Sequence, residues 1–126
     1  MRAADTNVLV RLIARDDAKQ VAAAERFVAP GAWISHLVLA ETTWVLETVF
    51  ELGRREIATT VEMLLDHDRL IVQDADVVRA AVAQLRRKLT VGFSDCLILE
   101  IARKAGHLPL GTFDRQLGGL ADAERL

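Results

Sequence analysis

A chain of 126 residues with a single cysteine is long enough to bury a core as one domain, residues 1–126, and cannot form an internal disulfide. Hydrophobic residues make up 52% of it, yet no apolar run approaches the roughly 20 residues that span a bilayer. The net charge of −2 does not by itself indicate nucleic-acid binding. With no signal peptide in view, we expect a cytoplasmic protein without a membrane span, whose apolar excess partly forms an interface.

Short apolar segments alternate with helical patterns along the whole chain. We expect strands at about 2–5, 32–35, 69–73 and 108–113, the first of them buried. We expect helices at about 7–15, 18–28, 37–50, 54–67, 74–88 and 94–106. This alternation predicts an α/β fold with a parallel sheet covered by helices on both faces.

Most polar residues at the ends of these elements have an ordinary role in starting or ending a helix. Asp16 or Asp17 is expected to cap the helix at 18–28. Ser35 is expected to cap the helix at 37–50, and Ser94 the helix at 94–106. Gly106 is expected to end the helix that begins near Ser94.

Four acids are harder to explain in this way. Asp5 and Asp114 each follow a predicted strand, Glu41 shares a helix face with apolar residues, and Asp95 lies in the first turn of an apolar helix. Capping remains an alternative for Asp5 and Asp114, and the helix dipole for Asp95. For Asp5, the neighbours Thr6 and Asn7 are equally good caps, which favours a different role for its carboxylate.

Parallel strands bring their carboxyl ends to one edge of a sheet, where sites form in folds of this kind. Carboxylates about 5 Å apart repel by roughly 3 kcal/mol per pair at an effective dielectric near 20, so a cluster needs protons or a cation. The three histidines show no metal-ligand spacing, and Cys96 suits a small core position. Oxygen ligands alone favour Mg²⁺ or Mn²⁺.

The segments "DTNVLVRL", "LAETTWVL", "FSDCLILEIARKAG" and "LGTFDRQL" together resemble, in order, the four acidic motifs of the PIN domain family, most closely its VapC-type toxins of bacterial toxin–antitoxin pairs. The resemblance covers nearly the whole chain. It implies a three-layer α/β/α sandwich with a central parallel sheet and a metal-dependent ribonuclease activity.

The resemblance also implies a set of site residues. The catalytic acids and ligands of Mg²⁺, or of Mn²⁺, would be Asp5, Glu41, Asp95 and Asp114. The supporting polar residues would be Thr6, Asn7 and Thr112. One departure is Gln116, which stands where many relatives carry a further acid and so weakens the case for a second, tightly held metal ion.

A nuclease of this kind implies an RNA substrate and a small antitoxin protein as a partner, and we expect a homodimer. Without the four site acids, the chain has 16 basic and 14 acidic residues. Candidate contacts to the RNA backbone are Arg11, Arg15, Arg86 and Arg87, with Arg54, Arg55 and Lys88 as further candidates; all have the alternative of solvated helix faces.

Other classes of protein remain as alternatives. A phosphoacceptor receiver domain needs an acid pair near its first strand and a lysine after a late strand, and a haloacid-dehalogenase-like phosphatase needs an acid at the position of Asn7. Neither pattern is present. A non-catalytic metal-binding or RNA-binding module, and a housekeeping RNA-processing nuclease, stay open.

Overall fold

The computed structural model describes residues 1–126 and contains six α-helices, a short 3₁₀ helix and five short strands. The helices are α1 (Thr6–Ala14), α2 (Ala18–Val28), α3 (His36–Thr48), α4 (Arg54–Asp66), α5 (Ala75–Arg87) and α6 (Phe93–Ala105), with the 3₁₀ helix η1 at Leu117–Gly119. Each predicted helix is confirmed, with bounds that agree to within two residues. None of these helices is long and apolar enough to cross a membrane.

All strand pairs are parallel, but they belong to two separate sheets. The first holds β1 (Arg2–Ala3), β2 (Ala32–Ile34) and β3 (Leu70–Val72) in the order β1-β2-β3. The second holds β4 (Leu110–Thr112) and β5 (Ala123–Arg125), of which β5 was not predicted. The predicted α/β/α class with parallel strands is confirmed, while β4 pairs with β5 and not with the first sheet.

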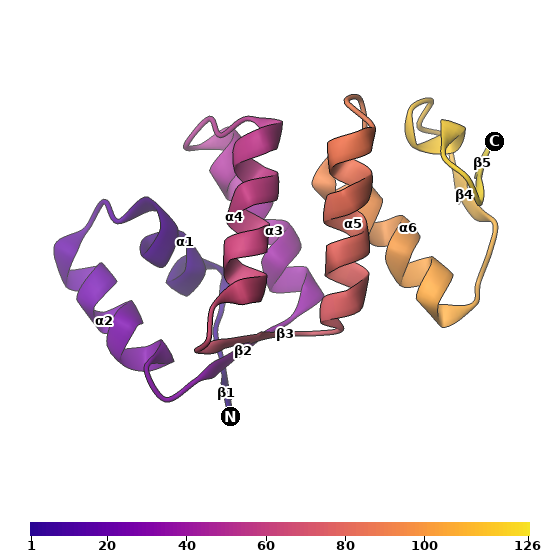
Figure 1. Ribbon diagram of the computed structural model, residues 1–126. Helices are drawn as coiled ribbons and strands as arrows, with labels where there is room; N and C mark the ends of the chain where they lie inside the picture. Colours follow the sequence, from indigo (N-terminus) through magenta and orange to yellow (C-terminus); the bar gives the residue numbers. More distant parts are fainter.

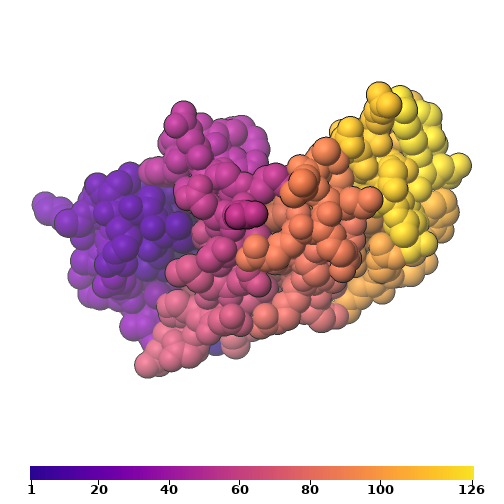
Figure 2. Space-filling view, turned by 45° about the horizontal axis from the view of Figure 1, so that its top comes forward, coloured from indigo at the N-terminus to yellow at the C-terminus, as the bar shows by residue number.

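The elements follow one another along the length of the molecule (Figure 1). Helices α1 and α2 lie at one end, α3 and α4 stand over the first sheet, and α5 and α6 come next. Strands β4 and β5 lie at the end opposite α1 and α2, away from β1 and the N-terminus. The space-filling view shows the same progression of the chain from end to end (Figure 2).

One face of the first sheet forms part of the core. Ala32, Ile34 and Leu70 are buried there in a cluster of 25 apolar residues that continues through α3, α4, α5 and α6. On the other face, Trp33 is 36% exposed and Ile71 54% exposed. The side chains on this face are therefore less completely covered than those on the core face.

Side-chain caps fix several helix ends. Asp17 accepts a hydrogen bond from the Gln20 backbone N–H at 3.0 Å, and Ser35 accepts one from that of Val38 at 3.1 Å, as predicted. Gly106 ends α6 with φ 80°, a left-handed conformation that suits glycine.

Two expectations about the ends of elements were wrong. Ser94 is not an N-cap, because α6 begins at Phe93 with Gly92 in the cap position. The first strand is not buried: Arg2 and Ala3 are both exposed, because β1 lies at the edge of its sheet. The expected core position of Cys96 is confirmed, and burial raises the pKa of its thiol to about 11.

The core predicts a large difference between two adjacent positions of α6. Leu99 is completely buried and Ile98 is 48% exposed. Leu99→Ala is expected to lower the free energy of unfolding by about 2–5 kcal/mol, because it removes buried methyl groups and leaves a cavity. Ile98→Ala, the matched control, is expected to cost clearly less. Urea unfolding of both variants measures this, and equal losses would contradict the position of α6.

Candidate active site

The four predicted acids lie at the ends of strands or on helices, as their sequence positions suggested. Asp5 separates β1 from α1, and Asp114 follows β4 by two residues. Asp95 lies in the first turn of α6, and Glu41 in the middle of α3.

Asp5 caps α1, contrary to the expectation that its neighbours would do so. Its Oδ1 accepts a hydrogen bond from the Asn7 backbone N–H at 2.9 Å, and α1 starts at Thr6. Asp5 has the extended backbone conformation that is typical of an N-cap, and Thr6 and Asn7 lie in the first turn of the helix that follows it. Capping occupies one of the two carboxylate oxygens, so it does not by itself remove Asp5 from a role as a ligand.

Asp114, like Asp5, holds the start of a helix with one of its carboxylate oxygens. Its Oδ1 accepts a hydrogen bond from the Leu117 backbone N–H at 2.7 Å and holds the start of η1. Its own backbone N–H donates to Thr112 Oγ1 at 3.0 Å. Thr112 therefore supports the turn that presents Asp114, while Gln116 is exposed beside it.

Asp95 is the half-buried member of the set. Its burial raises the pKa of its carboxyl, and the negative charge of Asp114 raises it further. The two carboxylates, from α6 and from the turn after β4, thus lie close enough for their charges to interact.

Glu41 is exposed. The expectation that its charge is held among apolar neighbours at a cost in free energy was therefore wrong. Glu41 lies on the same face of α3 as Leu37 and Trp44, as the spacing predicted, but these are 70% and 62% exposed. The face is apolar and open to solvent, because no element of the chain packs on it.

The four acids do not assemble into a metal site in this arrangement of the chain. Their oxygen donors suit Mg²⁺ or Mn²⁺. However, no three acidic, histidine or cysteine side chains anywhere in the chain are grouped so that they could hold one ion. The residues present therefore fit a divalent ion in chemistry but not in position.

Two further acids have environments that the sequence reasoning missed. Glu100 is buried and pairs with Arg103, whose Nε lies 3.3 Å from Glu100 Oε2. Burial raises the pKa of Glu47, and the positive charge of Arg54 opposes that shift. The i,i+3 spacing of Glu100 and Arg103 is the one signal in the sequence that pointed to a paired buried acid.

The four arginines first proposed to contact RNA, Arg11, Arg15, Arg86 and Arg87, each have a partner within the chain. The Arg11 guanidinium lies 2.9 Å from Asp16 and that of Arg15 lies 2.7 Å from Glu25. On α5, Arg86 pairs with Glu62 on α4, and Arg87 donates to Gln84. These are exposed contacts, which contribute little to stability.

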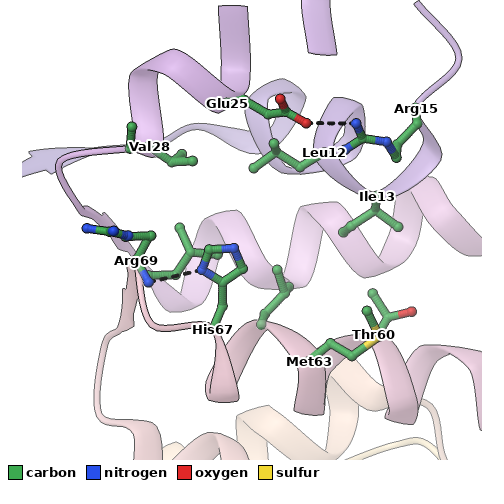
Figure 3. A pocket seen from close by; sticks show the side chains of 12 residues that line it. Leu12, Ile13, Arg15, Glu25, Val28, Thr60, Met63, His67 and Arg69 are labelled. Atoms are coloured by element: carbon green, nitrogen blue, oxygen red, sulfur yellow. Dashed lines mark hydrogen bonds and ion pairs between the residues drawn. The ribbon is translucent and has the colours of Figure 1, made fainter. Parts of the chain in front are cut away.

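A groove separate from the acids lies between α1, α2 and α4 (Figure 3). It has a volume of about 680 Å³. The ion pair of Arg15 and Glu25 lies at one rim, and His67 and Arg69 lie at another. Its apolar lining consists of Leu12, Ile13, Val28, Ala29, Met63, Leu64 and Leu70.

The raised pKa of Asp95 predicts how its substitution affects stability. A carboxyl with a raised pKa in the fold costs stability once the pH rises above its ordinary range near 4, because the fold disfavours the ionised form. Asp95→Asn is therefore expected to melt at or above the wild-type temperature at pH 7, and to lose this advantage at about pH 4.

Asp76 provides a control of opposite sign in the first turn of α5. A hydrogen bond from Lys104 lowers the pKa of Asp76, so Asp76→Asn is expected to lower the melting temperature at pH 7, and less so as the pH falls through that pKa. Thermal melts of both variants across this pH range measure the two trends. A destabilised Asp95→Asn at pH 7 that recovers in acid would contradict the assignment.

Comparison with known proteins adds the family to this geometry. Searches of curated proteins and of solved structures gave no match. The PIN domain family matches residues 3–123, which include all four acids and every element from α1 to β4. PIN domains are in general metal-dependent nucleases and typically bind divalent metal ions. On this match over almost its whole length, the chain belongs to the PIN domain family.

Proposed function

We propose that this chain is a Mg²⁺-dependent ribonuclease that hydrolyses phosphodiester bonds in RNA, with Mn²⁺ as an alternative ion, and that it is the toxin of a toxin–antitoxin pair of the VapC type. The observation that carries the proposal is the presence of Asp5, Glu41, Asp95 and Asp114 in order within a PIN domain. Two of these acids stand just beyond the carboxyl ends of parallel strands, where sites in α/β folds form.

Two of the proposed site acids interact through their charges in the structure. The negative charge of Asp114 raises the pKa of Asp95, and we propose these two acids as the centre of the site. Asp5 and Glu41 are proposed to complete it. Thr112 positions Asp114 through its hydroxyl, and Thr6 and Asn7 lie in the helical turn that Asp5 caps.

An antitoxin segment is the proposed occupant of the groove between α1, α2 and α4. The groove is lined mostly by apolar side chains and is rimmed by both charge signs. An amphipathic helix places apolar residues at spacings of three and four, which suits a groove of this kind, while its polar face stays in water.

A cleavage assay tests the nuclease proposal. Purified protein with Mg²⁺ is expected to cut RNA, and Asp95→Asn is expected to reduce the rate by at least about a hundredfold, because the amide keeps the shape and loses the charge. Sequencing of the RNA ends locates the cuts. Asp76→Asn, the control for a first-turn acid outside the site, is expected to cleave at the wild-type rate.

Two outcomes of this assay would contradict the proposal. Full activity in a folded Asp95→Asn variant would remove the site assignment. A wild-type protein that binds RNA or metal but leaves RNA intact under all conditions would favour the non-catalytic module.

The groove proposal predicts a loss of the partner on substitution of Met63. This side chain is 67% exposed, so Met63→Glu is expected to fold normally while placing a charge against the apolar face of an antitoxin helix. In co-expression with the product of the adjacent small reading frame, Met63→Glu is expected to weaken binding at least about tenfold.

Val49→Glu is the matched control, since Val49 is 65% exposed at the C-cap of α3, outside the groove. It is expected to retain the partner. Equal binding by both variants would place the partner elsewhere, and the absence of a small adjacent frame would favour a housekeeping nuclease.

A further inference from the structure

A small pocket with a basic lining lies between the start of α4 and the end of α5. The two helices pack side by side and run in opposite directions, so these two ends lie together at one end of the helix pair (Figure 1). The pocket has a volume of about 150 Å³. We call it the basic pocket, and its lining consists of Arg54, Arg55, Ala58, Leu85, Arg86 and Leu89.

The positive charge at the basic pocket is not balanced by acids of the chain. Arg87 and Lys88 follow Arg86 at the end of α5 and continue the run of positive charge beyond the pocket. Among all these cations only Arg86 forms an ion pair, with Glu62 of α4, and that pair is exposed. A concave surface with an excess of one charge attracts ions of the opposite sign, so the ligand expected here is an anion.

Arg55 has a charge that the fold itself does not explain. It is exposed, forms no ion pair and lies in the first turn of α4. A cation at this end of a helix is unfavourable, because the helix dipole is positive there. Arg86, by contrast, lies in the last turn of α5, where the dipole favours a cation. A bound anion makes the contribution of Arg55 favourable as well.

Arg54 is fixed in position and has no acid as a partner. Its Nη2 donates to the Leu85 carbonyl at 2.9 Å and also to the carbonyl of Lys88, which ties the end of α5 to the start of α4. Its Nε is buried and has no hydrogen-bond partner. A half-buried cation without a counter-charge costs free energy, and an anion in the adjoining pocket offsets that cost.

The size and the side chains of the basic pocket suit a phosphate group. It is smaller than the cavities of about 300–1,000 Å³ that hold whole small molecules, so it fits a single charged group. A guanidinium donates two parallel N–H groups to phosphate oxygens, and this bidentate contact is the reason that arginine predominates in phosphate recognition.

The basic pocket is also close to the start of α6, where Asp95 lies. Arg54 lines a neighbouring cavity together with Gly92 and Phe93, the N-cap and first residue of α6. The connection from α5 to α6, residues 88–92, spans at most about 18 Å. That is the length of about five nucleotides in a helical strand, whose phosphates lie about 3.4 Å apart. A single strand of RNA therefore reaches from Asp95 to the pocket.

We propose that the basic pocket binds one backbone phosphate of the RNA, within about five nucleotides of the bond that is cut, and so fixes the strand relative to the acids. The proposal rests on the proposed nuclease function for the identity of the strand. Solvated helix faces were the alternative for Arg54 and Arg55, and the pocket between them and α5 favours a bound phosphate. Because a phosphate contact carries no base information, it positions RNA of any sequence.

Binding of single-stranded RNA tests the pocket without any cleavage. All variants carry Asp95→Asn, so that the RNA stays intact, and the anisotropy of a fluorescein-labelled RNA measures the affinity. Adding Arg55→Gln is expected to weaken binding about tenfold, because a charge-assisted hydrogen bond to phosphate is lost. The slope of log affinity against log salt concentration is expected to fall by about 0.7, the value for one phosphate contact on a single strand.

Arg26→Gln is the matched control for the loss of one positive charge. Arg26 is exposed on α2 and forms no ion pair, so its substitution is expected to leave affinity and slope unchanged. Arg55→Gln is expected to melt at or above the temperature of its parent, because it removes a cation from the positive end of the helix dipole. Arg55→Lys keeps the charge without the bidentate geometry and is expected to recover part of the binding.

Neutral phosphates locate the contact along the strand. RNAs in which a methylphosphonate replaces one phosphate at a time are bound to the parent and to its Arg55→Gln variant. At one position, within about five nucleotides of the cut, the replacement is expected to weaken binding by the parent. The same replacement is expected to have no further effect on Arg55→Gln, since both changes remove one contact.

Three results would overturn the proposal. The first is an affinity that Arg55→Gln leaves unchanged or reduces no more than Arg26→Gln does. The second is a methylphosphonate pattern that does not depend on Arg55. The third is inorganic phosphate that raises the melting temperature through Arg55 while RNA binding does not depend on this residue, which would assign the pocket to a free anion. Wild-type protein that binds RNA through Arg55 and leaves it uncut would refute the nuclease function alone.

Discussion

The packing of α6 against α3 and α5 decides where the C-terminal third of the chain lies. Phe93, Cys96 and Leu99 are buried in this contact, and each large apolar side chain contributes about 1.5–3 kcal/mol by leaving water. Because only residues 106–109 connect α6 to β4, this packing also fixes the second sheet. The half-buried position of Asp95 and its interaction with Asp114 follow from the same contact.

Capping and a place in the active site are compatible roles for one carboxylate. Asp5 and Asp114 each accept a backbone N–H with one oxygen, at 2.9 Å and 2.7 Å. The sequence reasoning treated the two roles as rivals and passed the cap to Thr6 or Asn7. The hydrogen bond instead fixes the direction of the carboxylate and leaves its second oxygen for other contacts, which is the kind of support that a binding group needs.

The helices were predictable because their signals are local. Apolar spacing, Asp17, Ser35 and Gly106 mark helix ends within a few residues, and the structure agrees at all of them. Strand pairing was not predictable in the same way. Strands of two or three residues carry too little pattern to choose a neighbour, and the choice between β1 and β5 as the partner of β4 depends on how distant helices pack.

The candidate site shows the same division between local and distant information. The positions of Asp5, Asp95 and Asp114 relative to their elements were read correctly from the sequence. The exposure of Glu41 was not, because its apolar neighbours Leu37 and Trp44 face solvent rather than another element. A helix face shows which residues lie together, but only the tertiary arrangement shows what covers them.

Ion pairs on the surface do not remove the arginines of α1 from a role with the proposed substrate. An exposed pair such as Arg11 with Asp16 contributes about 0–1 kcal/mol, so exchanging the carboxylate for a phosphate costs little. Arg11 lies six residues after Asp5, which is about 9 Å along the helix axis. A nucleic-acid backbone held by Arg11 would therefore lie within a nucleotide or two of the acid that starts the same helix, and this local placement, more than the net charge of −2, makes α1 a candidate contact for the proposed RNA substrate.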